Sequence, residues 1–122
     1  MPHEVRFTAN FIANLDAIRD FLDEQDAANA FQALVFRLFE DVIPNLELFP
    51  SIGRDFLELE PVSEEGRARL KALRKRAGIA TGIREYITGD YLILYAVRTR
   101  CLFLLAIRHH KQLSFDLKGH WA

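Results

Sequence analysis

IREYITGDYLILYAVRTRCLFLLAIRH, residues 83–109, contains the most strand-like runs of this 122-residue chain. Three candidate strands follow one another here: Ile83–Thr88, Tyr91–Arg98 and Leu102–His109. The connections at Gly89-Asp90 and Thr99-Arg100 are short enough for hairpins. YLILYAV and LFLLAI are apolar at every position, a pattern typical of strands covered on both faces. The sequence therefore predicts a three-stranded antiparallel meander with a buried centre.

The residues before this meander predict a strand and a first helix. Val5–Thr8 has strand character, and Thr8 stands where an N-cap residue would begin a helix. Apolar residues then recur at helical spacing, while polar residues fill the other face. The apolar stripe comprises Phe11, Ile12, Leu15, Ile18 and Leu22, and the polar face Asn14, Asp16, Arg19, Asp20 and Asp23.

A second helix is predicted directly after the first. Asp26 is a candidate N-cap, and apolar residues continue at steps of three and four from Ala27 to Ile43 until Pro44 and the Phe49-Pro50 pair end the pattern. Two amphipathic helices joined by about three residues fold back on each other as an antiparallel hairpin.

Residues 50–61 are predicted to form a loop or a short irregular strand. Ser63 with two glutamates is a favourable helix start, and Arg74-Lys75-Arg76 before Gly78 is a favourable end. We therefore expect an inserted, basic and mostly exposed helix at 63–77. The whole chain is predicted to be one two-layer α+β domain spanning 1–122, ordered β-α-α-(inserted α)-β-β-β, with an antiparallel sheet packed against the helical hairpin.

Composition supports a single soluble globular domain, with 50% hydrophobic residues and a net charge of -1. No run is long and apolar enough to cross a bilayer, so no membrane partner is expected and the predicted location is the cytoplasm.

The charge is unevenly divided between the two halves of the chain. Residues 1–60 carry four basic and twelve acidic side chains, and residues 61–122 carry twelve basic and five acidic ones. The basic half favours an anionic partner, although both charge sets can also be solvated faces.

Common catalytic signatures are missing from the sequence. There is no glycine-rich phosphate loop, no G-x-S-x-G elbow and no H-E-x-x-H motif. His109 and His110 are adjacent, and on a strand they would point to opposite faces and could not share a metal ion. We therefore expect neither a metal nor another cofactor. Cys101 is interpreted as a small apolar filler, since no base can be named for it.

The richest cluster is Arg108-His109-His110-Lys111, with Arg84 and Glu85 on a neighbouring strand. An imidazole can move a proton near neutral pH, and flanking cations can stabilise a phosphorane-like transition state. The cluster could therefore cleave RNA, or it could simply bind an acidic partner. Aromatic residues with a polar tip are candidates for stacking on bases, although a polar tip that reaches a strand edge is their commoner use. They are Tyr86, Tyr91, Tyr95 and Trp121.

In the order and spacing of its motifs, the chain resembles the RelE/ParE superfamily of bacterial type II toxins. The resemblance is carried by the opening VRFT, by Asn14-Leu15-Asp16-Ala17-Ile18, by the Asp26 to Phe31 segment and by the Phe49-Pro50-x-x-Gly53-Arg54 turn. It continues through Arg84-Glu85-Tyr86, Gly89 to Tyr95 and Ile107-Arg108-His109. The 63–77 helix looks like an insertion relative to compact members.

This resemblance implies a toxin held inactive by a cognate antitoxin, with a toxin–antitoxin hetero-oligomer as a possible assembly. The motifs are closer to the ParE branch, whose members poison DNA gyrase, and this implies a non-enzymatic binder. A RelE-like ribosome-dependent mRNA endoribonuclease is the alternative, and a non-toxic antitoxin-binding module is a third. Catalytic residues of a nuclease would be His109, Arg84, Arg108 and Lys111. Residues implied in target or antitoxin binding are Arg54, Arg84, Tyr91, Arg108, His110, Lys111 and Trp121.

Overall fold

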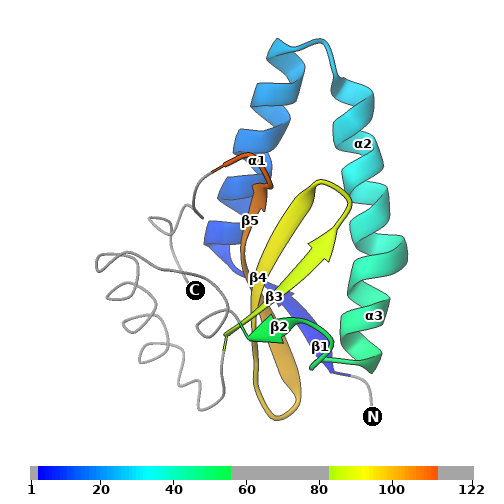
Figure 1. Ribbon diagram of the computed structural model, residues 1–122, viewed down its shortest axis with the longest axis vertical. Helices are drawn as coiled ribbons and strands as arrows, with labels where there is room; N and C mark the ends of the chain where they lie inside the picture. The colour runs from blue at the N-terminus through cyan, green and yellow to red at the C-terminus, as the bar shows by residue number, and fades with distance from the viewer. Residues whose placement is uncertain (1–2, 56–82, 113–122) are drawn as a thin grey trace.

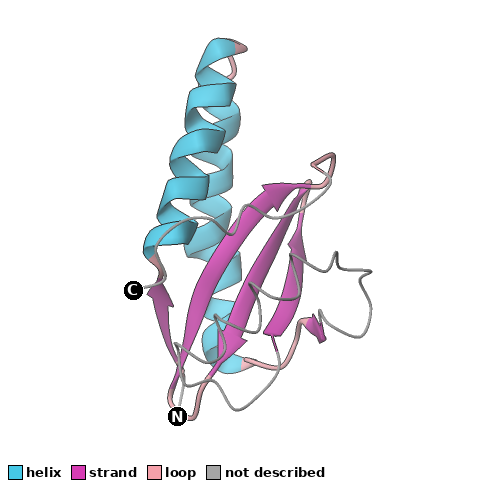
Figure 2. Ribbon diagram, turned by 90° about the vertical axis from the view of Figure 1, so that its left-hand side faces the viewer, coloured by secondary structure: helices cyan, strands magenta, loops and turns pink. Residues whose placement is uncertain are grey.

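The computed structural model describes residues 3–55 and 83–112, and it confirms the α+β class. Helices cover one face of a twisted sheet, and the tip of their hairpin projects beyond it (Figures 1 and 2). The helical elements are α1 (Ala9–Glu24), α2 (Ala28–Arg37), the π-helical turn η1 (Leu38–Val42) and α3 (Ile43–Leu48). The strands are β1 (Glu4–Phe7), β2 (Arg54–Asp55), β3 (Ile83–Thr88), β4 (Tyr91–Val97) and β5 (Cys101–His109).

The sheet has the order β1-β5-β4-β3-β2. The predicted meander β3-β4-β5 is present and antiparallel, within a few residues of its expected bounds. The sheet as a whole is mixed, however, because β1 lies parallel to β5, with Val5 opposite Leu102. The prediction of a purely antiparallel sheet was wrong in this respect. The pairing joins segments almost a hundred residues apart, and local sequence patterns do not encode such a contact.

Thr8 caps α1 as expected, because its Oγ1 accepts a hydrogen bond from the Phe11 backbone N at 3.2 Å. The prediction for Asp26 was wrong. Ala27 is the N-cap of α2, and Asp26 instead adopts a left-handed backbone conformation with φ 54° in the tight connection between the helices. Asp is one of the residues that tolerate this conformation. Asp26 therefore suits the turn between the helices, although it does not cap α2.

Of the two predicted stops of the second helix, Pro44 does not end the helical segment, whereas the Phe49-Pro50 pair directly follows its last residue. The π-helical turn η1 interrupts the α-helical hydrogen bonding just before Pro44, which then falls in the first turn of α3. A proline is tolerated there because the first turn of a helix needs no intrahelical N–H donor. The helical segment consequently runs on to Leu48.

The hydrophobic core lies between the helices and the sheet. It contains Phe11, Leu34, Leu38, Val42, Leu46, Ile93, Tyr95, Leu102, Leu104 and Ile107. Leu94, Ala96 and Ala106, which alternate with these positions, are also fully buried, so the central strands are covered on both faces as predicted. Ile12 is 43% exposed, although the α1 pattern placed it in the buried stripe.

Buried polar side chains of α1 fix the position of β5. The β4–β5 pairing shifts register between Leu94 and Tyr95, which leaves one extra residue on β5. Asn10 Nδ2 donates to the Leu105 carbonyl at 2.8 Å, and Asn14 Oδ1 accepts from the Ile107 amide at 3.0 Å. Asn14 was expected on the solvated face, but it is buried because the irregular strand needs its oxygen.

The predicted 63–77 helix and the C-terminal residues, including Trp121, lie outside the described residues. Within the described ranges, no helix is both long enough and apolar enough to span a bilayer.

Candidate functional site

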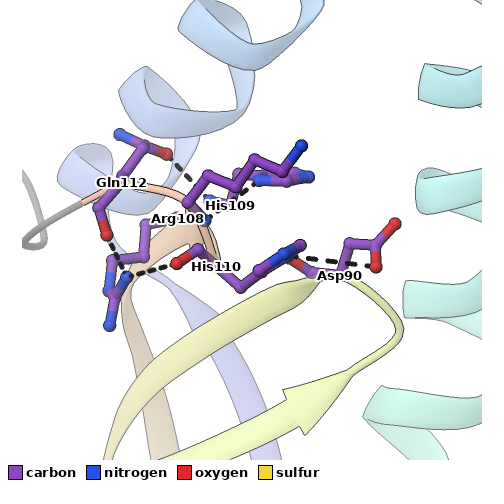
Figure 3. Close-up of polar contacts among 6 residues, drawn as sticks. Asp90, Arg108, His109, His110 and Gln112 are labelled. Atoms are coloured by element: carbon purple, nitrogen blue, oxygen red, sulfur yellow. Dashed lines mark hydrogen bonds and ion pairs between the residues drawn. The ribbon is translucent and has the colours of Figure 1, made fainter.

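Most of the cluster predicted from the sequence gathers at one end of the sheet. Tyr91, the first residue of β4, lies directly opposite His109, the last residue of β5. The β3–β4 turn at Gly89-Asp90 stands beside them, and the chain after β5 turns over this end (Figure 3). We call the surface formed by Asp90, His109, His110 and Lys111 the histidine end.

Arg108 and Gln112 hold the turn after β5 in place. The Arg108 side chain donates from Nη1 to the carbonyls of Gln112 and His110. Gln112 in turn accepts from the His109 backbone N through its Oε1 at 2.8 Å and donates its own N–H to the His109 carbonyl at 2.9 Å. Arg108 is 9% exposed, so it supports this turn from within the fold (Figure 3).

His109 is wedged between two rings. The Tyr91 ring meets it edge to face at 5.3 Å, and the His110 ring lies 4.4 Å away. The Lys111 backbone N donates to Nδ1 of His109 at 3.2 Å, so the neutral imidazole carries its proton on Nε2. Loss of hydration lowers the pKa of His109 below its ordinary value, and His110 lowers it further, whereas Asp90 acts in the opposite direction.

His110 has the opposite tautomer. Its Nδ1 lies 3.2 Å from the Asp90 carbonyl oxygen, which can only accept, so Nδ1 carries the proton and Nε2 is left as an acceptor. The Asp90 carboxylate lies 3.9 Å from the same nitrogen. The expectation that the two histidines point to opposite faces was wrong. Strand alternation ends at His109, and the backbone turn at His110 brings the rings together.

Arg54 and Arg84 belong to a different region, near β2. The Arg84 Nη1 donates to the Gly53 carbonyl at 2.5 Å, and Arg54 forms a 2.7 Å ion pair with the buried carboxylate of Glu85. The Tyr95 hydroxyl donates to the Pro50 carbonyl at 2.8 Å and accepts from the Gly53 N–H at 2.9 Å. We call this region, formed by Gly53, Arg54, Arg84, Glu85 and Tyr95, the tyrosine latch.

The two regions are well separated along the sheet. Arg84 pairs with Tyr95, whereas His109 pairs with Tyr91, four residues away on β4. That spacing corresponds to about 13 Å along a strand. The structure therefore brings Tyr91, Arg108, His110 and Lys111 together with His109, and it places Arg54 and Arg84 elsewhere. Tyr95 has no exposed surface and cannot stack on a base, and its hydroxyl instead binds the backbone of Pro50 and Gly53.

The sequence analysis did not identify Arg37 as a site residue. This last residue of α2 extends its guanidinium over Gly89, into the space that a Cβ at Gly89 would occupy. Gly89 also has a positive φ of 55°, which favours glycine. A helix-to-turn contact of this kind has no local sequence signal. Within residues 3–55 and 83–112, no three His, Cys, Asp or Glu side chains are grouped so that they could hold a metal ion.

Comparison with known families identifies the chain. The family model described as the ParE toxin of the type II toxin–antitoxin system parDE matches residues 5–114. The chain belongs to the ParE toxin family. A ParE-family toxin has a cognate antitoxin as its partner, and the resemblance inferred from the sequence motifs is confirmed. No curated protein matches the chain.

Proposed function

We propose that this toxin arrests growth by poisoning DNA gyrase and that its antitoxin blocks the same action. The observation that carries the proposal is membership of the ParE family over residues 5–114. The separation of Arg84 from His109 supports it, because their positions lie about 13 Å apart along the strands and the Arg84 guanidinium binds the Gly53 carbonyl. A toxin that acts by binding gyrase does not need Arg84 and His109 to meet at one phosphate.

A ribosome-dependent endoribonuclease is the second candidate, and the histidine pair is the observation that favours it. Neutral His110 presents Nε2 as an acceptor, and neutral His109 presents Nε2–H as a donor. A base and an acid of this kind are what RNA transphosphorylation requires. Arg108 would have to act without Arg84, and its side chain already binds the carbonyls of the following turn.

The antitoxin is proposed to cover apolar side chains on the helices. Phe36 and Phe39 lie three residues apart and are 68% and 57% exposed. Phe39 also stacks on Phe7 of the edge strand β1, with ring centroids 6.2 Å apart. Neighbouring exposed phenylalanines are a feature of protein-binding surfaces. We expect Phe36→Ser to reduce co-purification of the antitoxin, with Ile87→Ser, an equally apolar and exposed position on β3, as the control.

The deciding experiment compares the two activities side by side. Purified toxin is added to gyrase with relaxed plasmid, and, separately, to a translation reaction programmed with a defined mRNA. The proposal expects inhibited supercoiling and protein-linked cleaved DNA, with both effects removed by antitoxin. RNA breaks at ribosomal positions without an effect on gyrase would establish the second candidate instead. Folded protein that affects neither reaction nor growth would identify a non-toxic antitoxin-binding module.

A further inference from the structure

We propose that the histidine end, together with Arg37, is a binding site for a phosphate group of a nucleic acid. The inference goes beyond the proposed function, because it concerns a ligand of the toxin itself and does not require gyrase to be the target.

The charge at this end favours an anion. Arg37 reaches it from α2 and Lys111 from the turn after β5, and both residues are exposed. The buried guanidinium of Arg108 adds a third positive charge beneath the turn. Asp90 is the opposing carboxylate, and its side chain is 75% exposed and therefore well screened by solvent. The two exposed cations come from separate elements, as in a site that surrounds a phosphate rather than a stripe along one helix.

The imidazoles are already oriented for such a ligand. The inward-facing Nδ1 atoms of both rings are engaged by backbone groups, the Lys111 N–H for His109 and the Asp90 carbonyl for His110. Within residues 3–55 and 83–112 no group binds either Nε2 atom, which leaves both for a ligand. His109 donates from Nε2 while it is neutral, and an imidazolium ring at His110 would donate from Nε2 as well. The oxygens of one phosphate group would accept from these nitrogens and from the side chains of Lys111 and Arg37.

The turn that carries the two rings is held by several hydrogen bonds, which lowers the entropic cost of binding. Arg108 and Gln112 close the turn that carries the rings, and the His110 backbone N donates to the Asp90 carbonyl at 2.8 Å. Gly89 leaves room for the Arg37 guanidinium beside this turn. The charged and titratable groups facing His109 within the described residues are Tyr91 of β4, Asp90 of the β3–β4 turn, and His110 and Lys111.

Inorganic phosphate tests the site directly. The imidazole resonances of the full-length, isotope-labelled toxin are followed by NMR across a pH series, with and without phosphate. Bound phosphate is expected to raise the pKa of His109 and to shift both imidazoles, because the protonated rings bind the anion more tightly. Chloride at equal ionic strength is the control. Imidazole resonances and a His109 pKa that respond equally to chloride and phosphate would overturn the proposal.

Matched variants distinguish a defined phosphate-binding site from a general attraction of the nucleic acid to positive charge. Binding of a short single-stranded oligonucleotide is measured at several salt concentrations for the toxin and for Lys111→Gln, Arg37→Gln and Arg98→Gln. Arg98 is exposed in the connection between β4 and β5, at the opposite end of the sheet. The first two variants are expected to weaken binding and to reduce the salt slope by about one each. Arg98→Gln is expected to bind like the parent, and an equal loss in this variant would refute the site.

The oligonucleotide is tested as DNA and as RNA of the same sequence, which identifies the source of the phosphate. Tighter binding of DNA assigns the site to the gyrase-bound substrate, and tighter binding of RNA assigns it to a message. The gyrase assay is scored separately on the same preparations. A toxin that poisons gyrase but binds neither phosphate nor oligonucleotide would refute this inference and leave the proposed function intact.

Discussion

The tyrosine latch and the histidine end are built from similar residue types, but they differ in how many of their polar atoms are already bound by other groups of the protein. Each combines an aromatic side chain, an arginine and a glycine at a close contact. In the latch the polar atoms bind one another: the Tyr95 hydroxyl, the Gly53 peptide and the Arg84 guanidinium form one connected set. At the histidine end, backbone groups occupy only one nitrogen of each imidazole. The comparison shows that a residue type reveals little about function until the partner of each polar atom is known.

The largest expected effect is on the latch. A Cβ at Gly53 would lie 2.7 Å from both the Glu85 carbonyl oxygen and the Tyr95 hydroxyl, and neither atom can move without breaking a strand or a buried hydrogen bond. We expect Gly53→Ala to lower the free energy of unfolding by about 3 kcal/mol. Urea unfolding followed by circular dichroism measures this. Parent-like stability would mean that the latch is loosely packed.

The Tyr95→Phe substitution tests the same region, with a smaller expected loss of stability. It removes the hydroxyl that joins Pro50 to Gly53 and leaves the Gly53 N–H buried without its acceptor. The expected loss is about 2 kcal/mol in the free energy of unfolding. Thermal melts compare this variant with Tyr91→Phe, whose position lies outside the latch, opposite His109 at the other end of β4. An equal loss in both variants would contradict the distinction between the two ends.

A smaller effect is expected from Gly89→Ala. The positive φ disfavours alanine by about 1 kcal/mol. The contact with Arg37 adds little, because the far end of an exposed, flexible side chain can move away. The same unfolding measurement should therefore rank this variant well above Gly53→Ala in stability. The reverse order would show that the Arg37 contact is as rigid as the latch.

The smallest predicted effect is a pH dependence. The pKa of His109 is lower in the folded protein than in the unfolded chain, so the unfolded chain binds the proton more readily. Stability therefore falls as the pH drops below the ordinary histidine value of about 6.5. Unfolding curves at neutral and mildly acidic pH, measured for the parent and for His109→Gln, isolate this contribution. The variant should lose less stability on acidification than the parent does.

Local patterns were enough to place the meander strands and the cap at Thr8, because hydrophobic runs and capping chemistry act within a few residues. They failed where distant segments meet. The parallel pairing of β1 with β5, the burial of Asn14 against the irregular strand and the reach of Arg37 over Gly89 all depend on contacts between separate elements. Likewise, the sequence placed Arg84 in one candidate cluster with His109, and only the register of β3, β4 and β5 shows how far apart their positions lie along the sheet.

The most direct test of the distinction between the histidine end and the tyrosine latch measures gyrase poisoning per folded molecule. The double variant His110→Gln/Lys111→Gln is compared with Tyr95→Phe at a temperature below the unfolding transition of both proteins. We predict that the double variant traps at least about tenfold less cleaved DNA than the parent, a loss equivalent to about 1.4 kcal/mol, whereas Tyr95→Phe traps as much as the parent once corrected for its folded fraction. Full activity in the double variant, or a loss confined to Tyr95→Phe, would contradict the account.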